Sequence, residues 1–351
     1  MNKIYSPLRL ITLLLSMILL GGCAQEVVRQ FDYQTPVTTV VWPQTPDLPR
    51  YRLIGELFGE TNFKQQKEGR SLLQIITGFF TGKARPNLLQ RPQSGYTDEQ
   101  GRVYVTDISR QALFVFDIPN NQLGVFGSLS TDLPFITPVA VSAAPQGDIY
   151  VSDSEHALVA RLRSDGTPVS LIGRGVLNRP TGIAYDPVGK QLFVADTHDH
   201  DIKVFDEHGN FVESIGRRGE EVGEFNFPTH LSFRNGKLYI TDAMNARIQI
   251  LDSTGEFITA FGKRGLFIGN IPHPKGVGVD SDGNIYVSES YYDTLLVYNP
   301  EGKLLLPIGG TADTVGNFYL PAGVWTDNNN RVYLADMFNG RVVVLQYLGG
   351  E

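Results

Sequence analysis

Cysteine is almost absent from this sequence. The 351 residues include one, Cys23, so the chain cannot form an internal disulfide. A fold of this length must then be held by packing and hydrogen bonds rather than by a disulfide framework. The role of Cys23 must therefore be inferred from its position near the start of the chain.

Basic residues are in deficit. The chain has 30 lysines and arginines against 37 acidic residues, a formal charge of −7. Removing residues 1–22, which include Lys3 and Arg9, leaves 28 basic and 37 acidic residues and a charge of −9. A nucleic-acid-binding protein needs a basic face to neutralise phosphates. We therefore expect no nucleic-acid partner.

A long membrane-spanning run is also missing from the N-terminal segment. The apolar run over residues 8–20 is shorter than the roughly 20 residues that cross a bilayer, and it follows Lys3. This pattern is typical of a secretory signal peptide, here residues 1–22. The four residues Leu20-Gly21-Gly22-Cys23 resemble the bacterial lipobox, which implies that Cys23 is acylated and begins the mature chain. The alternative is an ordinary secretory signal with a coincidental cysteine.

The resemblance to lipoproteins sets the expected location. It implies a lipid anchor in the bacterial cell envelope, and Ala24 after the cysteine favours the outer membrane by that family's sorting rule. The side of the membrane is left open. Residues 23–50 contain four prolines among polar residues and predict an extended linker between lipid and domain.

The remainder of the chain repeats. Its 37 glycines and 20 prolines are spread along it, as expected for many short strands joined by tight turns. An acidic residue ends an apolar, aromatic-rich strand every 43 to 47 residues, at Asp107, Asp153, Asp196, Asp242, Glu289 and Asp336. Six units of four short strands each predict an all-β, six-bladed β-propeller. We expect the five aspartates, Asp107, Asp153, Asp196, Asp242 and Asp336, to bond loop amides rather than to catalyse.

Two repeats carry a motif that resembles that of a known repeat family. Residues 242–248 and 336–342 share the pattern Asp-x-x-Asn-x-Arg-hydrophobic and resemble the core of the NHL repeat. The resemblance implies an NHL-type propeller over residues 91–351. The other four repeats keep the frame and change its polar positions, so the fold carries over further than any function.

The last repeat supplies three strands before the chain ends. Residues 51–59 match the fourth-strand pattern of residues 257–262, so they should pair with the strand at 341–345 and close the ring. Residues 60–90 form an insertion. Within it, Leu72, Leu73, Ile76, Phe79 and Phe80 have helical spacing, which predicts a short helix that packs on the propeller or docks a partner or the membrane surface.

One face should carry the function. Loops between the second and third strands, and loops between blades, share one end of a propeller, and most histidines fall in them. The candidate binding face is His156, His198, Asp199, His200, Asp201, His230, Asn245, Arg247, Tyr292, Asn339 and Arg341. We expect His230, at the start of an innermost strand, to point at the central axis.

Two functions remain in competition. The preferred one is a lipid-anchored binding or scaffold propeller without a cofactor, presenting its loop face to a protein, peptide or glycan. The alternative is a metal-dependent lyase or hydrolase, with zinc held by His156, His198, His200 and His230. No phosphate loop, nucleophile elbow or HExxH motif favours the enzyme.

Overall fold

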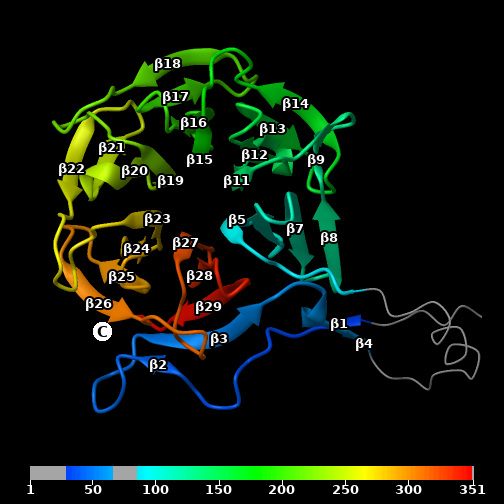
Figure 1. Cartoon of the computed structure of the whole chain (residues 1–351), viewed down its shortest axis with the longest axis vertical. Coiled ribbons are helices and arrows are strands. Elements are labelled where there is room, and N and C mark those ends of the chain that lie inside the picture. The colour runs from blue at the N-terminus through cyan, green and yellow to red at the C-terminus, as the bar shows by residue number, and fades with distance from the viewer. Residues whose placement is uncertain (1–28, 66–84, 350–351) are drawn as a thin grey trace, which may run out of the picture.

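The structure is a computed structural model that describes residues 29–65 and 85–349. It is an all-β, six-bladed propeller, with six sheets arranged around a central axis (Figure 1). The fold class predicted from the spacing of the acidic residues is confirmed. Within the described ranges, no helix is both long enough and apolar enough to cross a bilayer.

Each blade has four strands in chain order from the axis outward, except the last. Blade 1 is β5 (Pro92–Thr97), β6 (Val103–Asp107), β7 (Ala112–Asp117) and β8 (Gln122–Phe126). Blade 2 is β11 (Pro138–Ala143), β12 (Ile149–Asp153), β13 (Leu158–Leu162) and β14 (Pro168–Ile172). Blade 3 is β15 (Pro180–Asp186), β16 (Gln191–Asp196), β17 (Asp201–Phe205) and β18 (Phe211–Ile215).

The second half of the ring repeats the arrangement. Blade 4 is β19 (Pro228–Arg234), β20 (Lys237–Asp242), β21 (Arg247–Asp252) and β22 (Phe257–Phe261). Blade 5 is β23 (Pro274–Val279), β24 (Ile285–Glu289), β25 (Thr294–Tyr298) and β26 (Leu304–Ile308). Blade 6 is β27 (Pro321–Thr326), β28 (Arg331–Asp336) and β29 (Arg341–Tyr347), completed by β3 (Tyr51–Leu57) and β2 (Val41–Trp42).

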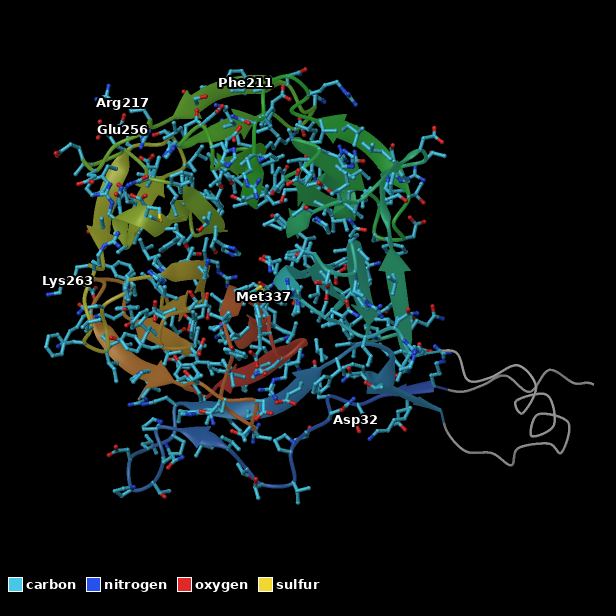
Figure 2. The ribbon with its side chains drawn as sticks, viewed as in Figure 1. Asp32, Phe211, Arg217, Glu256, Lys263 and Met337 are labelled. Carbon is cyan, nitrogen blue, oxygen red and sulfur yellow. The ribbon has the colours of Figure 1, made fainter. Side chains whose placement is uncertain are left out.

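The sequence of each blade suits its place. Every innermost strand begins with proline, which is tolerated at the first residue of a strand because it has no ladder hydrogen bond to donate there. The second strands are buried on both faces, and tyrosine occupies the same register position in five of them. Tyr104, Tyr150, Tyr286 and Tyr333 are fully buried and Tyr239 nearly so. Side chains fill the space between blades, while Arg217 and Lys263 lie at the rim (Figure 2).

The ring of blades is closed by pairing between a strand from the N-terminal part of the chain and the last strand. Strand β3 pairs antiparallel with β29, with Leu57 opposite Val342 and Tyr51 opposite Tyr347. Arg341 adds an ion pair across the same junction, 2.9 Å from the Glu56 carboxylate. The predicted closing strand is therefore confirmed, and β2 extends it to a fifth strand.

The insertion after β3 is described in part. It begins with a single 3-10 turn, Glu60–Asn62, and β4 (Phe63–Gln65), which pairs with β1 (Arg29–Phe31). The helix predicted around Leu72 to Phe80 lies outside the described residues, as do the signal peptide and Cys23. A second small hairpin, β9 (Ser128–Ser130) with β10 (Leu133–Pro134), joins blades 1 and 2.

Candidate functional site

The acidic strand ends organise the loops. The Asp107 carboxylate accepts hydrogen bonds from the amides of Gln90, Arg91 and Arg110, at 2.6 to 2.9 Å. Asp153, Asp196, Asp242, Glu289 and Asp336 likewise accept amides from the preceding inter-blade loop. Each acid fixes one loop to its blade, so the prediction that the five aspartates are structural residues is confirmed.

The Asn and Arg of the two full motifs extend this clamp. Asn245 and Arg247 both donate to Asp242, and Arg247 also donates to the carbonyls of Glu220, Glu221 and Glu224. Their donors are used to hold the loop between blades 3 and 4. These two side chains, predicted to lie on the binding face, use their hydrogen-bond donors within the fold.

Blade 6 repeats the clamp in a more buried form. Arg341 is 5% exposed, donates to Asp336 and Glu56, and reaches the carbonyls of Thr314 and Asn317. Burial raises the pKa of both Glu56 and Asp336, and the positive charge of Arg341 opposes that rise. Asn339 donates to Asp336 as well. Asn339 and Arg341, both predicted on the binding face, are thus used within the fold, and Arg341 is buried with its guanidinium engaged.

The loop histidines and their neighbours are similarly engaged. The Nδ1 of His200, a buried residue, accepts from the amide of Phe227, and the His156 ring bonds the Pro134 carbonyl at 2.9 Å. Asp199 and Asp201 pair with the buried ammonium of Lys203 at 3.1 and 2.5 Å. His198 is exposed.

The structure contradicts the metal site predicted from His156, His198, His200 and His230. Among residues 29–65 and 85–349, no three or more His, Cys, Asp or Glu side chains are grouped so that they could hold a metal ion. His156 and His200 direct ring nitrogens to the backbone of neighbouring inter-blade segments, and His230 lies in the wall of the central channel. The sequence pattern predicted that these histidines lie on the same face of the propeller, but it could not show how far apart their imidazole groups lie.

Apolar side chains are exposed on the loop face over blades 4 to 6. We call this set the apolar half-face. It consists of Val222, Phe227, Met244, Leu266, Phe267, Ile268, Tyr291, Val315, Tyr319 and Phe338. They lie in the loops after the second strands and between the blades. In the equivalent described loops of blades 1 to 3, Ile136 is the one large hydrophobic residue that is exposed.

Aromatic contacts hold the apolar half-face in place. The Tyr292 hydroxyl donates to the Leu266 carbonyl, and the Tyr292 ring meets Tyr291 edge-on with centroids 4.8 Å apart. Tyr319 and Phe338 form a second edge-on pair at 5.4 Å. Rigid aromatic rings lose little conformational entropy on binding and are enriched in protein interfaces. Tyr292 thus holds the Leu266 loop and the Tyr291 ring of this surface in place.

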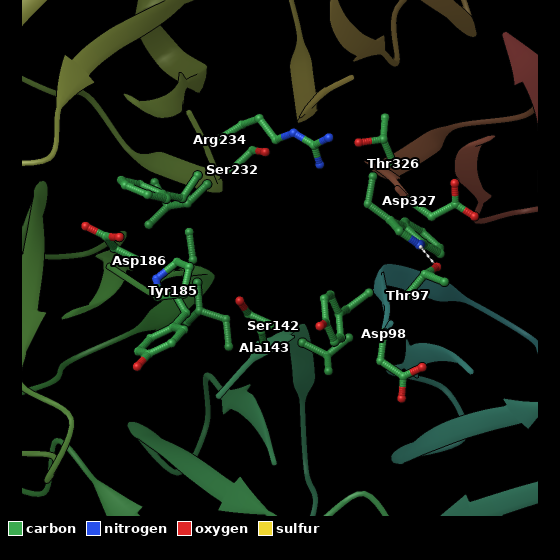
Figure 3. Close-up of a pocket in the computed structure, with 18 of the residues that line it drawn as sticks. Thr97, Asp98, Ser142, Ala143, Tyr185, Asp186, Ser232, Arg234, Thr326 and Asp327 are labelled. Carbon is green, nitrogen blue, oxygen red and sulfur yellow. Dashed lines mark hydrogen bonds between the residues drawn. The ribbon is translucent and has the colours of Figure 1, made fainter. Parts of the chain in front are cut away.

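The central channel contains a cavity of about 780 Å³ at the opposite end, among the turns that join first and second strands (Figure 3). Half-buried rings of Tyr96, Tyr185 and Phe233 contribute to its wall. Ser142, Ser232 and Arg234 also line it, and the Arg234 guanidinium points into the opening (Figure 3). The size is within the usual range for ligand pockets. This cavity was not predicted.

Close approach of the inner strands explains why the cavity opens at one end. A Cβ on Gly182 would lie 2.6 Å from the Cα of His230, and one on Gly323 would lie 2.6 Å from the Gln93 carbonyl oxygen. Neighbouring strands therefore meet backbone to backbone near their starts. His230 lies beside this contact, where burial lowers its pKa to about 4 although part of its surface stays accessible.

The comparisons with known proteins agree with the fold. A family described as a 6-bladed beta-propeller matches residues 184–233. No curated protein matches the chain. A structural genomics protein of unknown function from Bacteroides thetaiotaomicron is similar with a TM-score of 0.58 at 14% identity, over 75% of this chain and 71% of that one.

Two similar structures have functions in their names. Virginiamycin B lyase from Staphylococcus aureus has a TM-score of 0.53 at 14% identity, over 73% of this chain and 94% of that one. An auxiliary nutrient binding protein from Bacteroides thetaiotaomicron has a TM-score of 0.56 at 11% identity, over 74% of this chain and 70% of that one. At these identities the likeness establishes the propeller fold alone.

Proposed function

We propose that the chain is a partner-binding propeller of the NHL type, held in the bacterial cell envelope by a lipid on Cys23. The observation that carries the proposal is the apolar half-face. Leu266, Phe267 and Ile268 are 73%, 82% and 64% exposed at the tip of one loop. Exposed apolar patches of this kind on a rigid scaffold mark interaction surfaces.

The partner that fits this surface is a protein. A glycan site would depend on polar side chains beside its aromatic rings, whereas the amide groups of Asn245 and Asn339 and the carboxylates of Asp242, Glu289 and Asp336 are already hydrogen-bonded within the fold. Aliphatic side chains at a loop tip gain most from an apolar pocket on the partner. The similarity to a nutrient binding protein supports a binding role for the fold.

Site-specific photo-cross-linking in cells tests the docking surface. A photoreactive residue at Phe267 should give a discrete adduct with a protein. The same residue at Val188, which is 91% exposed in a turn at the other end of the propeller, is the matched control and should give none. Absence of an adduct at Phe267, or the same adduct at both positions, would overturn the proposal, and lipid adducts at Phe267 would assign the surface to the membrane instead.

Fractionation tests the anchor separately. Cys23→Ser should move the protein from the membrane fraction to the soluble fraction, because an acylated cysteine supplies the buried CH₂ groups that hold it. Retention of the Cys23→Ser chain in the membrane fraction would reject lipidation at this position.

A further inference from the structure

Arg234 occupies an exceptional position in the repeat. In blades 1, 5 and 6 the innermost strand is followed by aspartate: Asp98, Asp280 and Asp327. Each accepts the amide of the residue four positions on and the hydroxyl of the second-strand tyrosine. In blade 4 this register position is Arg234, directly opposite Lys237.

The blade 4 turn is built differently because arginine cannot accept those hydrogen bonds. Asn235 and Gly236, with φ of 51° and 71°, form a two-residue turn that requires left-handed backbone at both positions. The turn therefore closes without a side-chain acceptor. Arg234 is half-buried and makes no hydrogen bond or ion pair with any residue of the described ranges, so its guanidinium is left free in the cavity mouth (Figure 3).

Most carboxylates around the same mouth already have partners, and Glu99, which also lines it, is exposed. Asp98 lies 2.6 Å from Arg102, and Asp148 lies 2.8 Å from Arg161. The Asp186 carboxylate accepts the amide of Val188. Although these groups line the cavity with Arg234, none of them compensates its charge. A half-buried, unpaired guanidinium is a strong site for an anionic oxygen pair.

The remaining lining defines the rest of the ligand. Ser142 and Ser232 line the cavity and their hydroxyls have no partner among the described residues, so each can donate to a ligand oxygen. Tyr96 stacks on Tyr104 at 6.1 Å and Phe233 on Phe193 at 5.8 Å, which fixes two rings in the wall. The site thus combines one positive charge at the mouth with aromatic walls.

We propose that the turn-end cavity binds a small organic monocarboxylate with an aromatic or apolar body, and that Arg234 pairs with its carboxylate. The apolar body lies against Tyr96, Tyr185 and Phe233, where its burial drives binding. A polyanion fits less well, since Arg234 is the one cationic side chain in a lining that also includes Asp98, Asp186 and Asp327. This ligand site is separate from the apolar half-face and does not depend on it.

Calorimetric titration with a matched pair of probes tests the proposal. The probes are 1-naphthaleneacetate and its neutral analogue 1-naphthaleneacetamide. Wild-type protein should bind the carboxylate at least about tenfold more tightly than the amide, because only the carboxylate forms a charge-assisted pair. Arg234→Gln should remove that preference and leave amide binding unchanged.

Lys237→Gln provides the control. It removes the same charge from the register partner of Arg234 in the same turn, where the side chain is exposed, and should retain the preference. Ser232→Trp should block both probes by filling the cavity. Equal binding of both probes by wild type, no binding of either at millimolar concentration, or equal losses in the two charge variants would overturn the inference. Cross-linking at Phe267 should be unaffected by Arg234→Gln, so failure here is distinct from failure of the docking surface.

Discussion

The two ends of the propeller leave different kinds of side chain without a partner. At the loop end, carboxylates, amides and guanidinium groups bond one another and the loop backbone, and the apolar half-face is what stays exposed. At the turn end, Arg234, Ser142 and Ser232 face a cavity without such partners. A repeat position alone therefore does not reveal whether a polar residue is structural, since its neighbours decide what is left to bind a ligand.

Two arginines give the sharpest form of this comparison. Arg341→Ala should lower the free energy of unfolding by about 3–5 kcal/mol, because it leaves Glu56 and Asp336 buried without their cation. Arg234→Ala should change it by less than about 0.5 kcal/mol, since no described residue depends on that side chain. Urea denaturation of the two variants measures both. Similar losses in the two would show that the turn end is stabilised in the same way as the loop end.

The backbone contact that separates the two ends can be broken directly. Gly182→Ala should cost about 1–3 kcal/mol, because the new methyl group meets backbone atoms of His230 and Leu231 at 2.6 and 2.7 Å. Gly127→Ala is the control, as a Cβ there meets nothing within 4 Å and its backbone is not left-handed. Thermal denaturation compares them. An unchanged melting temperature for Gly182→Ala would mean that the inner strands can separate there.

The sequence allowed the fold and the closing strand to be predicted because both depend on patterns within the chain. The spacing of residues such as Asp196 and Asp242 marks the blades, and residues 51–59 share the alternation of other outer strands. The roles of Arg247 and Arg341 could not be predicted, since their acceptors are carbonyls of loops more than 20 residues away. One signal for the cavity was present: blade 4 has Arg-Asn-Gly-Lys where blades 1, 5 and 6 have an aspartate turn.

His230 lies between the two ends, and its titration should change stability less than the loss of Arg341 does. Burial lowers its pKa from 6.5 to about 4, so the folded state prefers the neutral ring. Its contribution to stability is complete above pH 6.5, is lost as the pH falls towards 4, and does not change below that. Because the ring is partly accessible to channel water, we expect a total loss of about 1–2 kcal/mol.

The difference in unfolding free energy between wild type and His230→Gln, measured from pH 7.5 to 4, should shrink by that amount. Subtracting the two proteins cancels the opposite contribution of Asp196, Glu289 and Asp336, whose pKa values burial raises. Parallel curves would place the His230 ring in water, with the inner wall of the cavity open to the loop end.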